Sequence, residues 1–249
     1  MRPKSAATLD AKWKSRPWYR KPSGAPGELR HPQDDLNLRL RRALSWLERA
    51  EKEYGVEEDL DAAFIFSWIA FNAVYEQFGT SSVYRDRKED EKRREYVSRI
   101  VAIQNSKSEI NSIVWSVLGD EIQQMLENRF VYAPYWSHRN NPAEARNWKQ
   151  RFNRDLKRAL QALSEKRTGE VLCELFYRLN TLRNQLLHGG ATWKGRVNRN
   201  QVEPGSRIMA LLVPIFIDVM IEHPNAGWGS PRYPVVREET PLSGWTGAG

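Results

Sequence analysis

The chain has 249 residues and carries 39 lysines and arginines against 31 aspartates and glutamates, a net charge of +8. Its 40% hydrophobic content argues against wholesale disorder, and its single cysteine, Cys173, excludes an internal disulfide framework and a cysteine-based zinc site. The longest apolar stretches, 62–75 and 208–221, are shorter than the roughly 20 residues that span a membrane. We therefore expect a cytoplasmic protein with no membrane partner.

The first 33 residues form a basic arm that holds +6 of the net +8 charge. The arm contains five prolines and no apolar periodicity, so we expect it to be largely irregular. Aromatic residues alternate with its cations, a pattern that can hold phosphates and stack on unpaired bases. The candidate RNA contacts in the arm are Lys12, Lys14, Arg16 and Trp18. The alternative is a solubilising tail with a few aromatic residues.

Residues 34–222 are predicted to be helical throughout, because apolar residues recur there at helical spacing and no alternating strand pattern of useful length occurs. The helix between about 57 and 79 is apolar on nearly every side, which predicts the buried central helix. A loop is expected at 131–142, which contains two prolines. The other expected helices span 34–55, about 96–103, 108–118, 120–130, 143–165, 168–188 and 206–222, the last kinked by Pro214.

The last 27 residues, 223–249, hold four prolines and five glycines and are predicted to be an irregular tail. We thus expect three parts: the arm 1–33, an all-α helical domain 34–222, and the tail. No phosphate-loop, dinucleotide or zinc-protease pattern occurs in the sequence, so we expect neither a cofactor nor a metal site.

The residues that suggest chemistry stand at the end of the predicted helix 168–188. Asn184 and His188 are four residues apart and share one helix face, and Arg183 is long enough to reach the same surface. Gly189 and Gly190 should end the helix directly after His188. A permanent cation, a polar orienter and an imidazole suit metal-free phosphodiester cleavage, in which a ribose 2′-hydroxyl attacks the adjacent phosphate. The alternative is that Arg183 is a surface residue and His188 a helix cap.

This Arg-Asn-x-x-x-His string followed by two glycines resembles the signature of the HEPN superfamily. The earlier string Phe-Ser-Trp-Ile-Ala-Phe-Asn-Ala-Val-Tyr at 66–75 resembles the central helix of its Apea-like branch. The resemblance covers roughly residues 35–222 and implies an up-and-down helical bundle that often dimerises. Active members are metal-independent endoribonucleases that commonly leave a 2′,3′-cyclic phosphate and serve as toxins or in antiviral defence.

Carried over to this sequence, the resemblance makes Arg183 the phosphate-binding residue, Asn184 the orienting residue and His188 the acid–base group, each acting with its counterpart in a second copy. The implied partners are RNA, a homodimer mate, and an antitoxin or defence-system partner. Gly190 stands where members controlled by nucleotidyltransferase antitoxins carry a tyrosine, so AMPylation at this position is not expected. Some members lack nuclease activity, so the alternative is a catalytically silent scaffold or nucleic-acid-binding module in a larger complex.

A third hypothesis is a generic helical nucleic-acid-binding protein in which the Arg–His spacing is coincidental. Lys194, Arg196 and Arg199 follow the motif and are candidate RNA contacts, with a solvated loop as the alternative. His138, in the loop expected at 131–142, is likewise either an RNA contact or part of a solvated loop.

Asn72, Trp68 and Tyr75 are candidate structural supports for the site. Asn72 either braces the motif helix by a hydrogen bond or is a core amide satisfied by a neighbouring backbone group. Trp68 and Tyr75 are expected to be core residues.

Overall fold

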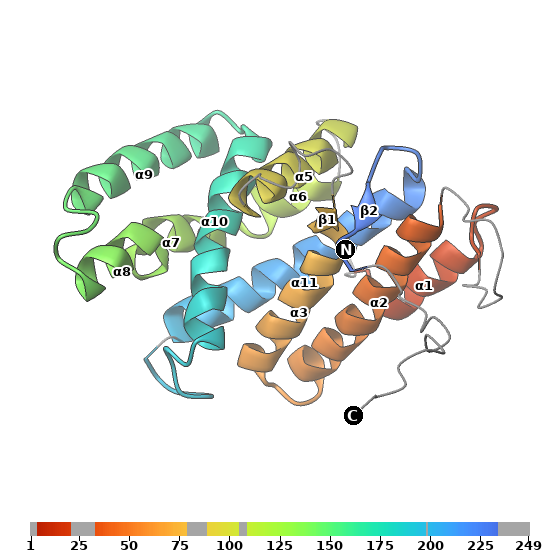
Figure 1. The fold of residues 1–249 in the computed structure, drawn as a ribbon, viewed down its shortest axis with the longest axis horizontal. Coiled ribbons are helices and arrows are strands. Elements are labelled where there is room, and N and C mark those ends of the chain that lie inside the picture. The colour runs from red at the N-terminus through yellow and green to blue at the C-terminus, as the bar shows by residue number, and fades with distance from the viewer. Residues whose placement is uncertain (1–3, 21–32, 79–88, 105–108, 198, 234–249) are drawn as a thin grey trace, which may run out of the picture.

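The computed structural model describes residues 4–20, 33–78, 89–104, 109–197 and 199–233. This part of the chain is 75% helical and forms an all-α bundle, which confirms the predicted fold class (Figure 1). Its helices are α1 (Ala6–Lys14), α2 (Asp34–Gly55), α3 (Leu60–Tyr75), α5 (Glu89–Ile103), α6 (Glu109–Ser116), α7 (Gly119–Glu127), the 3₁₀ helix η1 (Arg129–Val131), α8 (Ala133–Asn140), α9 (Trp148–Ser164), α10 (Thr168–Leu187) and α11 (Arg199–Glu222). The strands β1 (Gln77–Phe78) and β2 (Ser230–Pro231) pair antiparallel.

The core lies where α11 passes across α2 and α3 and meets α10 (Figure 1). Phe71 on α3 stacks near Phe176 on α10, with ring centroids 4.5 Å apart, and both rings also face Phe216 on α11. The sequence predicted α3 as the buried central helix; the structure shows that α11 is equally central, with most of its residues buried. By length and composition α11 could also cross a membrane, but 83% of its apolar window is buried inside this bundle.

Helix α11 begins at Arg199, seven residues before the predicted start at 206. The turns that the prediction missed contain Pro204 and Gly205, and both lie inside the helix. A Cβ added to Gly205 would lie 2.9 Å from Cδ2 of Leu182. The absence of a side chain at Gly205 therefore allows α11 to approach α10 closely. Here the glycine serves helix packing and does not end the helix.

The N-terminal arm contains one helix, α1, where the sequence predicted no regular structure. Helix α1 begins at a capping box in which the Ser5 hydroxyl accepts from the Thr8 amide. Leu9 and Trp13 are buried against α2 and α11, and the Trp13 indole N–H donates to Oδ1 of Asn37 at 2.9 Å. The apolar face of α1 has only three members, Ala6 being the other, which is too few to stand out among the cations.

The first part of the tail is also ordered on the bundle, although the whole tail was predicted to be irregular. Trp228 is 4% exposed, and the carbonyls of Trp228 and Gly229 accept hydrogen bonds from the buried Arg39 guanidinium. The same guanidinium donates to the carbonyls of Ala73 and Val74, which are among the unpaired groups at the C-terminal end of α3. One arginine thus caps α3 and fixes the tail; the tail beyond 233 lies outside the described residues.

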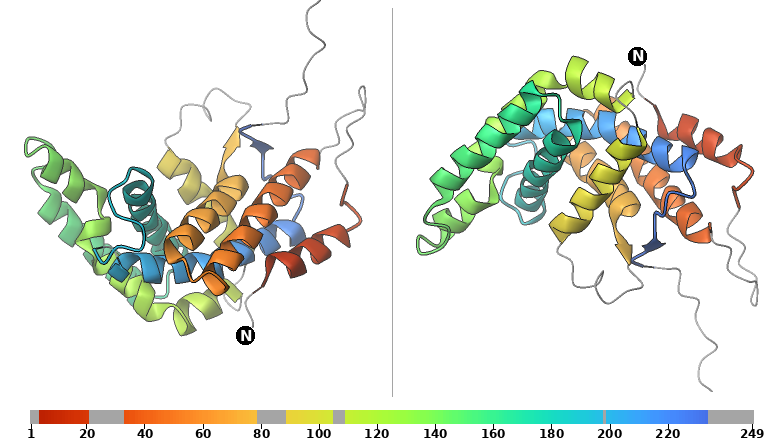
Figure 2. Two further views of the ribbon diagram at one scale, coloured as in Figure 1. Left: turned by 90° about the horizontal axis from the view of Figure 1, so that it is seen from below. Right: turned by 90° about the horizontal axis from the view of Figure 1, so that it is seen from above.

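The segment predicted as a loop at 131–142 contains a helix, α8. Pro134 occupies the first turn of α8, where the missing amide hydrogen costs nothing, so this proline starts a helix instead of interrupting one. Helices α7, α8 and α9 extend from one side of α10, and α1 lies at the opposite end of the molecule (Figure 2). The motif at the end of α10 lies on the same side as α7 and α8.

Candidate active site at the C-terminal end of α10

The motif helix ends where the glycine pair predicted. His188 is the C-cap of α10 and its amide donates to the Asn184 carbonyl at 3.0 Å. Gly189 has a φ of +70°, and the Gly190 amide returns to the Gln185 carbonyl at 2.7 Å, which closes the helix end. The His188 side chain is consequently exposed at the surface.

Arg183 and Asn184 are linked by their side chains. Nη1 of Arg183 donates to Oδ1 of Asn184 at 2.8 Å. On the helix wheel Arg183 points about 140° away from His188, whereas Asn184 points only about 40° away. The hydrogen bond therefore directs the guanidinium towards the face that carries His188. Asn184 thus contacts Arg183, and its orienting role stays a prediction.

The Arg183 guanidinium is half-buried and has hydrogen-bonding capacity left. Its Nε is buried without a partner among the described residues, and no carboxylate there pairs with it. Because Nε is enclosed by protein, the donors of Arg183 that remain for an anionic oxygen are on its Nη atoms.

The loop that follows the motif is attached to the N-terminal end of α3. Nε1 of Trp193 donates to Oδ2 of Asp59 at 2.6 Å, and the Lys194 amide donates to Oδ2 of Asp61 at 3.1 Å. Oδ1 of Asp61 also pairs with Arg199. The two aspartates hold the loop 189–197 in place, and neither was singled out from the sequence, because only the tertiary fold brings them to the loop.

The three candidate RNA contacts after the motif differ in their environment. The side chains of Lys194 and Arg196 are exposed, and neither forms an ion pair within the described part of the chain. Arg199 is ion-paired with Asp61, so it is less available to a phosphate than predicted. Two free cations, Lys194 and Arg196, thus lie in the loop beside His188.

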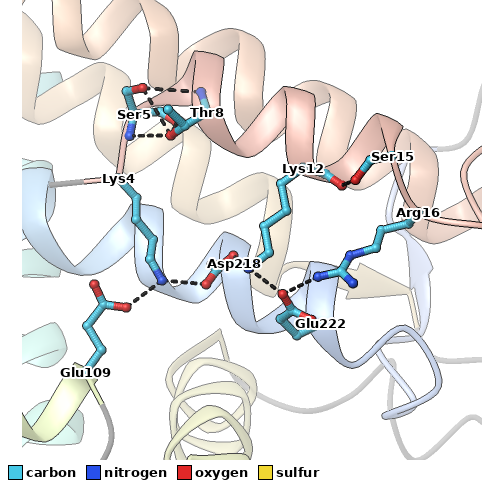
Figure 3. Close-up of polar contacts among 9 residues, drawn as sticks. All are labelled: Lys4, Ser5, Thr8, Lys12, Ser15, Arg16, Glu109, Asp218 and Glu222. Atoms are coloured by element: carbon cyan, nitrogen blue, oxygen red, sulfur yellow. Dashed lines mark hydrogen bonds and ion pairs between the residues drawn. The ribbon is translucent and has the colours of Figure 1, made fainter.

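The candidate contacts in the arm do not lie at this site, because α1 is at the other end of the molecule (Figure 2). Lys12 pairs with Asp218 and Glu222 on α11, and Arg16 pairs with the same glutamate (Figure 3). Lys14 pairs with Asp10 within α1 at 2.6 Å, and Trp18 packs partly buried against the core. Lys12 and Arg16 are therefore ion-paired with α11, and the proposal that the arm contacts RNA stays a prediction.

Asp218 is the centre of this ion-pair cluster, with Lys4 and Lys12 each 2.5 Å from one of its carboxylate oxygens (Figure 3). Burial alone would raise the pKa of the Asp218 carboxyl, but the hydrogen bonds from the two lysines outweigh burial and lower that pKa below its ordinary value. Contact with the two lysines therefore favours the ionised form of the Asp218 carboxyl.

The three residues predicted to support the site lie away from it. Trp68 and Tyr75 are 1% exposed and belong to the core, as expected. Asn72 is next to Phe71, which packs on Phe176, twelve residues before His188 and roughly 18 Å along α10. Oδ1 of Asn72 is buried without a hydrogen-bond partner among the described residues. This oxygen therefore does not brace the motif helix, and the two interpretations of the amide group as a whole stay predictions.

A cavity of about 830 Å³ opens beside the last turn of α10, between α7, α8 and the start of α11. Arg196 lines it, whereas Arg183, Asn184 and His188 do not. The cavity was not predicted from the sequence. His138, the other candidate RNA contact, lies in α8 with Nδ1 3.0 Å from the Glu144 carbonyl.

Within the described residues no group of three or more histidine, cysteine, aspartate or glutamate side chains is placed to hold a metal ion. No family model, no curated protein and no solved structure matches this chain. The function is therefore inferred from the arrangement at the end of α10 and from the residues around it.

Proposed function

We propose that the protein is a metal-independent endoribonuclease of the HEPN type, acting as a toxin or antiviral-defence effector. The observation that carries the proposal is the 2.8 Å hydrogen bond that holds the Arg183 guanidinium on Asn184 at the helix end where His188 is exposed. A fixed cation beside a solvent-accessible imidazole supplies charge stabilisation and proton transfer, the two functions that phosphodiester cleavage requires. The exposed Lys194 and Arg196 add positive charge at the same end.

In the proposed reaction Arg183 binds the non-bridging oxygens of the scissile phosphate. His188 removes the proton from the ribose 2′-hydroxyl, whose oxygen attacks the phosphorus while the bond from phosphorus to the 5′-oxygen breaks. The 5′-oxygen leaves with a proton from a second imidazole. The products are a 2′,3′-cyclic phosphate and a 5′-hydroxyl, so no water is consumed in this step and no redox change occurs.

The second imidazole is proposed to come from a second copy of the chain, because the described residues of one protomer present a single histidine, His188, at this site. Large apolar side chains surround the motif: Leu187 is 51% exposed, Trp193 71% and Val197 84%. Such exposure favours a contact surface, and a two-fold contact there would place two copies of Arg183 and His188 around one phosphate.

The test is incubation of the purified protein with total RNA in excess EDTA, beside His188→Ala. The matched control is His223→Ala, because His223 is also exposed and directly follows the last residue of a helix, α11. We expect discrete fragments from the wild type and from His223→Ala, and at least about 100-fold less cleavage with His188→Ala. Equal cleavage by all three proteins would contradict the proposal, and RNA binding without cleavage by any of them would favour the silent scaffold.

A further inference from the structure

The cavity beside the last turn of α10 has an unusual lining. Helix α7 contributes polar residues at one-face spacing, Asp120, Gln123, Gln124 and Glu127, while its buried face carries Ile122 and Met125. Across from α7 stand the aromatic rings of Phe130 and Trp136, with Asn128 and Gln201 between them. Amides, two aromatic rings and one exposed arginine, Arg196, thus share one cavity.

The rings are held in fixed positions by hydrogen bonds and a cation. Nε1 of Trp136 donates to the Phe130 carbonyl at 2.7 Å, so the only polar atom of the indole is already satisfied. The Phe130 amide donates to Oδ1 of Asn128 at 2.8 Å, and the Arg129 guanidinium stacks 5.0 Å from the Phe130 ring centre. Phe130 nevertheless stays 40% exposed. A fixed, partly exposed ring is a ready surface for a planar ligand.

The cavity adjoins the motif through Gln185. Nε2 of Gln185 donates to the Phe130 carbonyl at 2.5 Å, and Nε2 of Gln201 lies 3.4 Å from Oε1 of Gln185. Asn128 in turn donates to Gln201 at 3.0 Å. Gln185 and His188 are three residues apart and are neighbours on the surface of α10. Two residues of the cavity lining, Phe130 and Gln201, are therefore in contact with the last turn of α10 through Gln185, although no residue of α10 itself lines the cavity.

We propose that this cavity binds one nucleotide of a single-stranded RNA, next to the phosphate that the motif cleaves. The inference rests on the proposed function and adds to it the part of the substrate that is recognised. The base stacks on Phe130 and Trp136, its polar edge meets the amides of Gln123 and Gln124, and its phosphate lies towards Arg196.

The acidic residues of the cavity decide the orientation of the nucleotide. Asp120 and Glu127 lie on α7, and Glu127 accepts from Nε2 of Gln123 at 2.8 Å. Carboxylates repel a phosphate but accept hydrogen bonds from exocyclic amino groups of bases. The base therefore faces α7, and the phosphate faces the loop that carries Arg196.

The experiment measures the binding of a fluorescent single-stranded RNA octamer by anisotropy, with the full chain carrying His188→Ala so that the strand stays intact. In this background Trp136→Leu and Arg196→Gln are compared with Trp46→Leu and Arg41→Gln, which alter exposed residues on α2 outside the cavity. Phe130→Leu is the second ring variant, used if Trp136→Leu fails to show a native circular dichroism spectrum.

We expect about tenfold weaker binding when a ring is lost, because one stacked base is removed. Arg196→Gln should lower the slope of log affinity against log salt by about 0.7, the value for one phosphate contact on a single strand. The controls should bind as the parent does. Cavity variants that bind as tightly as the controls would overturn the inference.

Free mononucleotides are tested as competitors, since the same chemistry would accept them. Displacement of the octamer only at mononucleotide concentrations far above the octamer's dissociation constant supports a strand site, whereas a mononucleotide that binds as tightly as the octamer overturns it.

The experiments can contradict one of the two proposals without contradicting the other. If the wild-type protein does not cleave RNA but the cavity variants bind it more weakly, the nuclease is contradicted and the cavity site is supported. If His188→Ala abolishes cleavage while the cavity variants bind and cleave RNA as the parent does, the nuclease is supported and the cavity site is contradicted.

Discussion

Helix α1 and the segment 183–199 are both rich in cations and tryptophan, yet the structure uses them in opposite ways. Lys12 in α1 and Arg16, two residues beyond its C-terminal end, pair with acidic residues of α11, and Trp13 is buried. In the later segment Lys194 and Arg196 form no ion pair within the described residues, and Trp193 is 71% exposed. The difference comes from the neighbours: Asp218 and Glu222 face α1, while only Asp59 and Asp61 face the loop.

This contrast shows why composition alone does not locate a nucleic-acid surface. A cation that already has a buried carboxylate partner must lose that partner before it can bind a phosphate, whereas an exposed unpaired cation loses only water. By this criterion the end of α10 is the better candidate surface, although α1 belongs to the more basic part of the sequence. Four substitutions can break or sharpen the comparison.

The largest expected effect belongs to Trp13→Ala. If α1 is a structural helix, removing this 3% exposed indole leaves a cavity and removes a hydrogen bond to Asn37, and should lower the free energy of unfolding by about 3–5 kcal/mol. Urea unfolding followed by circular dichroism measures the loss. A variant as stable as the wild type would show that α1 does not belong to the folded unit.

Arg183→Ala should reduce RNA cleavage by about 100- to 1000-fold, because it removes the cation proposed to stabilise the phosphate. Lys12→Ala is the control, since Lys12 is paired with Asp218 and Glu222 and should leave the cleavage rate unchanged. Initial rates on a defined RNA measure both. If Lys12→Ala reduced the cleavage rate more than Arg183→Ala does, the RNA-binding surface would lie at α1 and not at the end of α10.

Asp218→Asn should lower the free energy of unfolding at neutral pH by about 1–2 kcal/mol, because Lys4 and Lys12 lose their shared carboxylate. The folded-state pKa of Asp218 is lowered, so its stabilisation is present above the unfolded pKa of about 3.9 and is lost as pH falls through the folded pKa. Unfolding curves of the two proteins should therefore differ at pH 7 and converge in acid. If the free energies of unfolding of the two proteins differed by the same amount at every pH, the ionised Asp218 carboxylate would not be the stabilising group.

The smallest effect is expected for Lys194→Gln. This lysine is exposed and lies 5.2 Å from the Trp193 ring centre, so its loss should weaken RNA binding a fewfold and lower the salt slope by about 0.7. Stability should not change. A salt slope equal to that of the wild type would remove Lys194 from the RNA-binding surface.

The sequence predicted well those elements whose boundaries are marked by local signals. Helix α10 begins at Thr168 as predicted, and it ends at Leu187 because Gly189 adopts a positive φ. The same rules failed at Pro134 and Gly205, where a residue that usually ends a helix has another role. Pro134 starts α8, and Gly205 allows contact with Leu182. Their roles depend on residues that are distant in the sequence.

The candidate site was predictable only in part. The exposed end of α10, with Asn184 and His188 on one helix face, follows from helical geometry and was expected. The hydrogen bond between Arg183 and Asn184 was not predicted. The attachment of the loop to Asp59 and Asp61, and the cavity lined by Phe130 and Trp136, depend on how α3, α7 and α8 pack around α10. No spacing rule links these segments, because each is more than forty residues from the motif in the sequence.

The most direct test of the central claim is the chemistry of the ends that cleavage leaves. A defined single-stranded RNA is cut by the wild-type protein in EDTA, and the fragments are analysed by mass spectrometry. The account predicts a 2′,3′-cyclic phosphate and a 5′-hydroxyl at each cut, no product from a strand with a 2′-deoxy nucleotide at the cut site, and none with His188→Ala. Fragments that end in a 3′-hydroxyl and a 5′-phosphate, or equal cutting of the 2′-deoxy strand, would contradict it.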